Sequence, residues 1–122
     1  MRVLLLESDH SFAKIVSEAL AQDGHSIVWC SGADTALTEL DRKNVDAILV
    51  EIQLAKHNGI EFLYEIRSYP DLAKIPVILL TMIAEIDLQI DDSTKQQLGI
   101  YRYLYKPTTS LRKLAAVIKQ IA

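Results

Sequence analysis

The sequence alternates repeatedly between two hydrophobic patterns. Five short runs are apolar at nearly every position, and they occupy residues 3–6, 27–29, 47–50, 75–80 and 101–105. Such runs are typical of strands covered on both faces. Between them, apolar residues recur at intervals of three and four, the spacing of one helix face. The alternation predicts about five strand–helix units, and therefore an α/β fold with helices on both faces of a parallel sheet and right-handed crossovers.

Three amphipathic stripes mark the clearest helices. They consist of Phe12, Ile15, Val16, Ala19 and Leu20; of Ala33, Ala36, Leu37 and Leu40; and of Leu111, Leu114, Ala115, Ile118 and Ile121. A further helix is predicted over residues 60–67, after the Asn58-Gly59 turn and before Pro70. Residues 82–98 are the least regular stretch. We predict a long loop there, followed by a short helix over residues 94–98.

The residues that flank these stripes suit helix ends. Gly24 follows the first stripe, where a left-handed cap is favoured. Ser31 and Asp34 have the spacing of a capping box for the second helix. Thr109 or Ser110 is suited to cap the last helix.

Length and composition exclude several classes of protein. The 122 residues fit one domain spanning residues 1–122, and the single cysteine cannot form an internal disulfide. The net charge is −3 and the basic residues are scattered, so neither a nucleic-acid surface nor a polybasic membrane contact is expected. The apolar run at the start is too short for a signal peptide or a membrane span. We expect a cytoplasmic globular domain.

Polar side chains follow four of the five predicted strands. The first strand is followed by Glu7-Ser8-Asp9, the third by Glu51, the fourth by Thr81 and the fifth by Lys106-Pro107. In an open doubly wound sheet, ligands bind beyond the carboxyl ends of the strands. We therefore expect carboxylates, a hydroxyl and an ammonium group to face one crevice.

In this order and spacing the sequence resembles the receiver domains of two-component response regulators, over the whole chain. The matching segments are residues 4–9, residues 46–51 with Gly59 eight positions on, residues 76–81, and then Gly99, Tyr103 and Lys106-Pro107. The resemblance implies a flavodoxin-like five-stranded parallel sheet in the order 2-1-3-4-5, with helices on both faces.

The resemblance also implies a chemistry. Members of the family hold Mg²⁺ with acidic residues after the first strand, and an aspartate ending the third strand accepts a phosphoryl group from a kinase histidine. A Thr or Ser and a Lys contact the phosphate, which assigns Thr81 and Lys106 to these positions and Tyr103 to the aromatic switch position. The Lys106–Pro107 bond is often cis in the family, so a cis bond is expected here.

The chain departs from the family pattern at two positions. Glu51 stands in place of the phosphoacceptor aspartate, and Ser8 stands in the acidic pair, which leaves Glu7 and Asp9. The extra methylene moves the Glu51 oxygens outward by about 1.5 Å, and a displacement near 1 Å costs roughly 10²-fold in a reaction that depends on positioning. The longer side chain is expected to pair with Lys106 and to accept from the Thr81 hydroxyl.

The second substitution bears on the metal. Ser8 removes a unit charge from a Mg²⁺ shell that needs carboxylates. We therefore expect no resident metal or other cofactor, with Glu7, Asp9 and Glu51 as the only candidate ligands.

These departures predict a pseudo-receiver, which is a signalling module and not an enzyme. Its partners are expected to be a histidine kinase, an output domain or a homodimer mate, contacted through the fourth helix, fifth strand and fifth helix. Whether Glu51 mimics the phosphorylated state stays open, because a carboxylate carries one charge against roughly two for a phosphoryl group.

Two other functions remain as alternatives. One is a working Mg²⁺-dependent phosphoacceptor that uses Glu51 or Asp9 and is regulated by a histidine kinase. The other, a flavodoxin-like enzyme or nucleotide binder, is disfavoured because residues 7–10 contain no glycine that lets a backbone approach phosphate.

Several other side chains have an ordinary structural explanation. Tyr101, Tyr103 and Tyr105 alternate and must point to one side of the last strand, either as a contact patch or as packing under a helix. His10 is expected to be exposed at the start of a helix. Trp29 is expected in the core or at the sheet edge, and Cys30 as a buried small hydrophobe.

Overall fold

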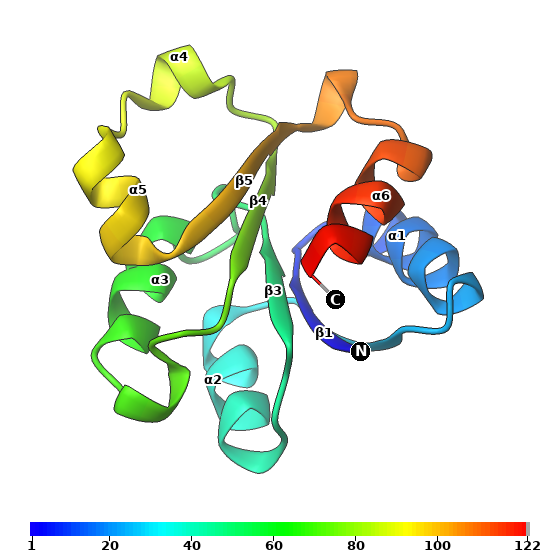
Figure 1. Ribbon diagram of the computed structural model, residues 1–122, viewed down its shortest axis with the longest axis horizontal. Coiled ribbons are helices and arrows are strands. Elements are labelled where there is room, and N and C mark those ends of the chain that lie inside the picture. Colours follow the sequence, from blue (N-terminus) through cyan, green and yellow to red (C-terminus); the bar gives the residue numbers. More distant parts are fainter. Residues whose placement is uncertain (122) are drawn as a thin grey trace.

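A five-stranded parallel sheet organises residues 1–121, the part of the chain that the computed structural model describes. Its strands are β1 (Arg2–Leu6), β2 (Ser26–Cys30), β3 (Ala47–Val50), β4 (Val77–Thr81) and β5 (Ile100–Tyr105). They pair in the order β2-β1-β3-β4-β5, so the predicted doubly wound topology is confirmed (Figure 1). The order reverses at β1, which places the crevice beyond the carboxyl ends of β1 and β3.

Helices cover both faces of the sheet. They are α1 (His10–Gln22), α2 (Ala33–Arg42), α3 (Gly59–Arg67), α4 (Glu85–Leu88), α5 (Asp92–Leu98) and α6 (Leu111–Ile121), with 3-10 helices η1 (Pro70–Leu72) and η2 (Lys106–Thr108). One face carries α1 and α6, and the other carries α2, α3 and α5 (Figure 1). None of the helices within residues 1–121 has the length and apolar character needed to span a bilayer.

The central strands are apolar at nearly every position because each face of the sheet has its own core. In β1, Leu4 and Leu6 pack beneath α2 and α3, whereas Val3 and Leu5 pack beneath α1 and α6. The same alternation continues in β3, all of whose residues are fully buried. A strand covered on both sides has no position for a polar residue until it ends. This confines the polar groups of β1 and β3 to the rim of the sheet.

Two predictions about helices α1 and α2 were wrong. Ile15 is 51% exposed, because α1 turns Ala13, Val16 and Leu20 toward the sheet. The N-cap of α2 is Gly32, with no side-chain capping bond, so Ser31 does not form a capping box.

Other predicted helix ends are confirmed. Gly24 has a positive φ of 88° just after α1. Ser110 accepts a hydrogen bond from the Lys113 N–H at 3.0 Å and so caps α6.

The segment between β4 and β5 contains more structure than the sequence predicted. The expected short helix is present as α5 but begins at Asp92, two residues early, because Asp91 caps it by accepting from the Thr94 N–H at 2.7 Å. A separate turn of helix, α4, was missed, since four residues are too few to show a hydrophobic period. Its Ile86 is 81% exposed, and α4 stands away from the sheet (Figure 1).

The guanidinium group of Arg67 holds the C-terminal end of this segment by hydrogen bonds. Arg67, the last residue of α3, donates to the carbonyl oxygens of Leu98 at 2.9 Å, Leu72 at 2.6 Å and Ile75 at 2.6 Å. Gly99 ends α5 in the left-handed region with φ 68°, and a Cβ there would collide with the Arg67 guanidinium. The end of α5 is therefore tied to α3 and to the approach to β4.

The expected cis bond before Pro107 is not found, because the Lys106–Pro107 bond is trans. The reason lies in η2, which begins at Lys106 directly after β5 and takes Pro107 into a 3-10 turn. The Thr109 N–H donates to the Lys106 carbonyl at 3.2 Å, so Pro107 is the second residue of the turn, a position of trans prolines, whereas a cis proline occupies the third.

Candidate functional site

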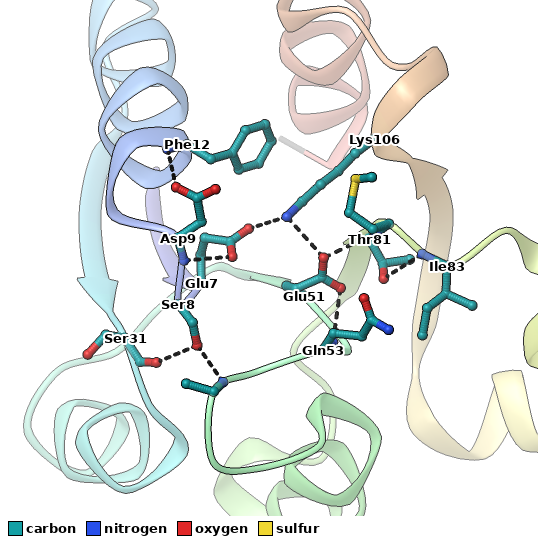
Figure 2. A network of polar contacts seen from close by, with 12 residues as sticks. Glu7, Ser8, Asp9, Phe12, Ser31, Glu51, Gln53, Thr81, Ile83 and Lys106 are labelled. Atoms are coloured by element: carbon teal, nitrogen blue, oxygen red, sulfur yellow. Dashed lines mark hydrogen bonds and ion pairs between the residues drawn. The ribbon is translucent and has the colours of Figure 1, made fainter.

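The four strand-end residues meet in one buried polar cluster at the carboxyl edge of the sheet, which we call the pocket. Glu7 follows β1, Glu51 follows β3, Thr81 ends β4 and Lys106 follows β5 (Figure 2). The two glutamates are each 3% exposed and Thr81 is fully buried. Because the residues of each strand are buried in the two cores, the polar residue at the end of that strand is held at this edge of the sheet.

Lys106 lies at the centre of the pocket. Its Nζ is 2.6 Å from Glu7 Oε1 and 2.9 Å from Glu51 Oε1, and its side chain is 11% exposed. The ring of Phe12 lies under the same ammonium, 4.4 Å from Nζ to the ring centroid, which is a cation–π distance. One cation thus joins the ends of β1, β3 and β5 and is covered by a ring from α1.

The Glu51 carboxylate uses both of its oxygens. Oε1, which pairs with Lys106, also accepts from the Met82 N–H at 3.1 Å, and Oε2 accepts from the Gln53 N–H at 3.1 Å. Gly59, the first residue of α3, packs so closely on the Glu51 carbonyl that a Cβ there would overlap it. The glutamate is therefore fixed at its backbone by α3, and its carboxylate is held by Lys106 and by the N–H groups of Met82 and Gln53.

The pocket continues into the segment after β4. The Ile83 N–H donates to Thr81 Oγ1 at 3.2 Å, and the Tyr103 hydroxyl donates to the Ile83 carbonyl at 2.6 Å. Burial, with the negative charges of Glu85 and Glu51, raises the pKa of Tyr103 to about 12, so its phenol stays a neutral donor at physiological pH. The residues after β4 are thereby held by Glu51, Thr81 and Tyr103 together.

Ser8 and Asp9 do not face Lys106. The Ser8 hydroxyl donates to the Ser31 carbonyl at 3.2 Å and accepts from the Ala55 N–H at 2.9 Å, which joins three loops. Asp9 is the N-cap of α1, and its Oδ1 accepts from the Phe12 N–H at 3.1 Å. The acidic cluster foreseen from the sequence thus divides, and only Glu7 turns inward (Figure 2).

The charges of the pocket stabilise one another. Burial alone would raise the pKa of Glu51, but hydrogen bonds from the Thr81 hydroxyl, Lys106 and the Gln53 N–H bring that pKa below its ordinary value. Burial alone would lower the pKa of Lys106, but Glu7 and Glu51 raise it. At neutral pH Glu51 and Lys106 are therefore charged and paired.

These residues do not fit the Mg²⁺ ion that the fold suggests. Mg²⁺ requires an octahedron of oxygen ligands that includes one or two carboxylates. Here Lys106 lies between Glu7 and Glu51, while Ser8 and Asp9 are committed to other bonds. Over residues 1–121, no three His, Cys, Asp or Glu side chains are grouped to hold a metal.

Sequence analysis missed several contributors to the pocket. Phe12 was assigned only to a helix stripe, although its place three residues after the Asp9 cap sets it over the pocket. The N–H groups of Gln53 and Met82 carry no side-chain signal. Trp29, expected as a filler, lies on the edge strand β2, 39% exposed, and its Nε1 donates to the Glu7 carbonyl at 2.9 Å.

His10 and Cys30 lie as predicted. His10 is exposed at the start of α1, with its ring edge-to-face against Trp29 at 4.8 Å. Cys30 is buried, and burial raises the pKa of its thiol to about 11.

This topology, with acidic, hydroxyl and lysine side chains at the carboxyl ends of β1, β3, β4 and β5, defines a receiver-type α/β protein. The family model for the response regulator receiver domain matches residues 3–119. The chain therefore belongs to the response regulator receiver domain family, whose members act in two-component phosphorelay signalling.

Two relatives of the chain are named as transcriptional regulatory proteins. CpxR of Klebsiella pneumoniae is 31% identical over 120 residues, which are 98% of this chain and 48% of CpxR. The uncharacterized transcriptional regulatory protein YcbL of Bacillus subtilis is 30% identical over 114 residues, which are 93% of this chain and 48% of YcbL. The chain thus spans about half the length of these relatives.

Solved structures show the same fold. A two-component response regulator from Clostridium difficile superposes with a TM-score of 0.85 at 26% identity, covering 99% of this chain and 94% of that one. The chemotaxis response regulator CheY4 of Vibrio cholerae superposes with a TM-score of 0.86 at 19% identity, covering 99% and 98% of the two chains.

Proposed function

We propose that this chain is a pseudo-receiver, a phosphorelay module of the cytoplasm that keeps the receiver scaffold and does not take up phosphate at residue 51. The observation that carries the proposal is the ion pair of Glu51 with Lys106, at 2.9 Å in a pocket that also contains the Glu7–Lys106 pair at 2.6 Å. The carboxylate and the ammonium neutralise each other where an incoming phosphoryl group would need both.

Transfer to Glu51 is opposed by position and by charge. Attack by a Glu51 oxygen requires it to leave Lys106, Met82 or Gln53, each within 3.1 Å. The product would carry a charge of roughly −2 beside Glu7, and the residues present do not hold a divalent cation to offset it. Phosphoryl transfer depends on positioning and charge neutralisation, and the pocket lacks both.

The pocket supports a fixed signalling state. Glu51 holds the Met82 N–H directly, and Thr81 and Tyr103 hold Ile83 on either side. Glu51 thus positions the start of the β4–β5 segment permanently, without a modification that is added and removed.

The output of this state lies in protein contacts of α5, β5 and α6, the structural counterparts of the fourth helix, fifth strand and fifth helix predicted from the sequence. Tyr101 on β5 is 45% exposed and Leu111 at the start of α6 is 41% exposed, and Ile86 on α4 lies on the adjoining segment. Exposed apolar and tyrosine side chains are favoured at protein interfaces. The partners proposed are a histidine kinase, an output domain or a second copy of the chain, with neither nucleic acid nor a membrane contacted by this domain.

A phosphodonor experiment tests the proposal. The purified chain is incubated with acetyl phosphate and Mg²⁺ and its intact mass is measured. No added phosphoryl mass is expected. The matched variant, Ser8→Asp with Glu51→Asp, restores the acidic pattern of the family and is expected to gain a Mg²⁺-dependent label.

Labelling of the unaltered chain, dependent on Mg²⁺ and abolished by Glu51→Gln or Asp9→Asn, would overturn the proposal. It would establish the alternative of a working phosphoacceptor regulated by a histidine kinase.

A further inference from the structure

The pocket brings two carboxylates from separate strands onto one lysine nitrogen. Glu7 and Glu51 are each 3% exposed, and both bind Lys106 Nζ within 2.9 Å. Without a cation between them, two ionised carboxylates this deeply buried would repel each other strongly. A cation is therefore a structural requirement of this sheet edge.

We propose that the Lys106 ammonium is the resident cation of this pocket, taking the place of a divalent metal ion and excluding it. This inference rests on the proposed function, because a pocket with a built-in cation is one that does not use Mg²⁺ for phosphoryl transfer. One side chain of this chain, Lys106, balances the charge of both carboxylates.

The geometry of Lys106 fits this task. An ammonium group has three N–H donors, and Glu7 and Glu51 each accept from one of them. The centroid of the Phe12 ring lies 4.4 Å from the same nitrogen. The lysine is tethered by β5, so its effective concentration at the carboxylates is far above that of free ions. Mg²⁺ gives up its water reluctantly, and it would have to displace an ammonium that is already paired.

Ser8 and Asp9, which follow Glu7 after β1, form hydrogen bonds outside the pocket, as expected if they do not bind a metal ion. Ser8 Oγ joins the loop at Ala55 to the carbonyl of Ser31, and the Asp9 carboxylate caps α1. The second carboxylate oxygen of Glu7, Oε2, accepts from the Asp9 N–H at 3.1 Å. Two carboxylates are thus matched to one ammonium, with the loop that precedes α1 folded around them.

Removal of the ammonium tests the inference. In Lys106→Met the stem of the side chain is kept and the charge is lost, so Glu7 and Glu51 are left facing each other. We expect this variant to melt at a lower temperature and to regain stability as Mg²⁺ or Mn²⁺ is added, because an ion that binds only the folded state stabilises it. The melting temperature of the unaltered chain is expected not to respond to millimolar Mg²⁺.

Trp29 provides a second readout that does not depend on melting. It is the single tryptophan of the chain, and its Nε1 donates to the Glu7 carbonyl at 2.9 Å. Paramagnetic Mn²⁺ bound between Glu7 and Glu51 is expected to quench its fluorescence saturably in Lys106→Met. No saturable quenching is expected in the unaltered chain.

Two control variants define the site. Lys95→Met removes a lysine whose ion pair with Glu85 lies outside the pocket, and it is expected to leave both the melting temperature and the cation response unchanged. Glu7→Gln combined with Lys106→Met removes one of the two ligands and is expected to abolish the cation response.

Three results would overturn the inference. The first is saturable Mn²⁺ quenching of Trp29 in the unaltered chain, a measurement that stands even if Lys106→Met does not fold. The second is a folded Lys106→Met chain that ignores divalent cations. The third is a response that persists in the double variant. A chain that binds Mn²⁺ but takes no label from acetyl phosphate would contradict this inference alone, whereas a labelled chain would contradict the proposed function.

Discussion

The pocket at the carboxyl edge of the sheet and the segment formed by residues 82–98 are neighbours in space with opposite physical character. In the pocket, Glu7, Glu51 and Thr81 are at most 3% exposed. In the segment, Ile86 is 81% exposed and α4 contains no buried residue. Charged groups are buried in the pocket, whereas the large apolar side chain of Ile86 lies in solvent, the reverse of the usual arrangement.

The two regions are stabilised in different ways. The pocket is rigid because its buried groups are paired, and within residues 1–121 no buried side-chain nitrogen or oxygen lacks a hydrogen-bond partner. Hydrogen bonds anchor the segment where it enters and leaves, at Ile83 and Leu98, and between them Leu88 packs partly against the core. Mutations in the pocket should therefore affect global stability, whereas those in the middle of the segment should affect binding.

The largest expected effect on stability follows loss of the central charge. Lys106→Met leaves two buried carboxylates without a counter-ion, so we expect the free energy of unfolding to fall by about 3–5 kcal/mol in a solution free of divalent cations. Urea denaturation at neutral pH measures it. Lys95→Met, in the exposed pair with Glu85, should leave the midpoint unchanged, and equal effects of the two variants would show that the regions do not differ.

A matched pair of apolar truncations sharpens the contrast. Leu49 in β3 is fully buried, so Leu49→Ala should destabilise the chain by roughly 2–5 kcal/mol through lost burial and a residual cavity. Ile86→Ala should leave the urea midpoint almost unchanged, because the side chain is already in solvent. A large loss of stability in Ile86→Ala would contradict the exposed position of α4.

The acid limb of the stability curve reports on Glu51. Its pKa is lowered in the folded chain from an ordinary value of 4.5, so the carboxylate contributes stability that is present above pH 4.5 and is lost as the pH falls through the folded pKa. Glu51→Gln should cost roughly 1–3 kcal/mol at neutral pH and should flatten the decline below pH 4.5. Urea midpoints measured across that pH range test this, and an unchanged acid limb would refute it.

The smallest effect is expected at the junction of the two regions. Tyr103→Phe removes the hydrogen bond to the Ile83 carbonyl, worth about 1 kcal/mol. Amide hydrogen exchange should speed up in residues 82–98 and stay constant in β1 and β3. The mutation should also remove the tyrosine that ionises at about pH 12 in a spectrophotometric titration. Uniformly faster exchange would mean that Tyr103 supports the whole fold.

The same division explains what the sequence could predict. β3 was predicted at its observed bounds, Ala47–Val50, because burial on both faces makes every residue apolar. The strand ends then indicated which side chains share the rim, and Glu7, Glu51, Thr81 and Lys106 do lie there. The hydrophobic pattern carries this information along the whole sheet.

Other features depend on contacts that no local pattern encodes. Ile15 satisfies the helical spacing but faces solvent, since α1 is oriented by Ala13, Val16 and Leu20. α4 follows from no period, and its end depends on Gln89 in the left-handed region with φ 54°. The inward turn of Glu7, rather than Asp9, is decided by capping of α1 and by Lys106, which lies 99 residues away in sequence.

The three carbonyl bonds of Arg67 limit how the β4–β5 connection can move. One terminus is anchored at Ile83 by Thr81 and Tyr103, and the other at Leu98 by the guanidinium. Between these anchors Leu88 packs partly against the core, whereas no residue of α4 is fully buried and Ile86 is 81% exposed, so the connection is least constrained around Ile86. A partner that binds at Ile86 can therefore shift α4 while the strands beneath keep their register.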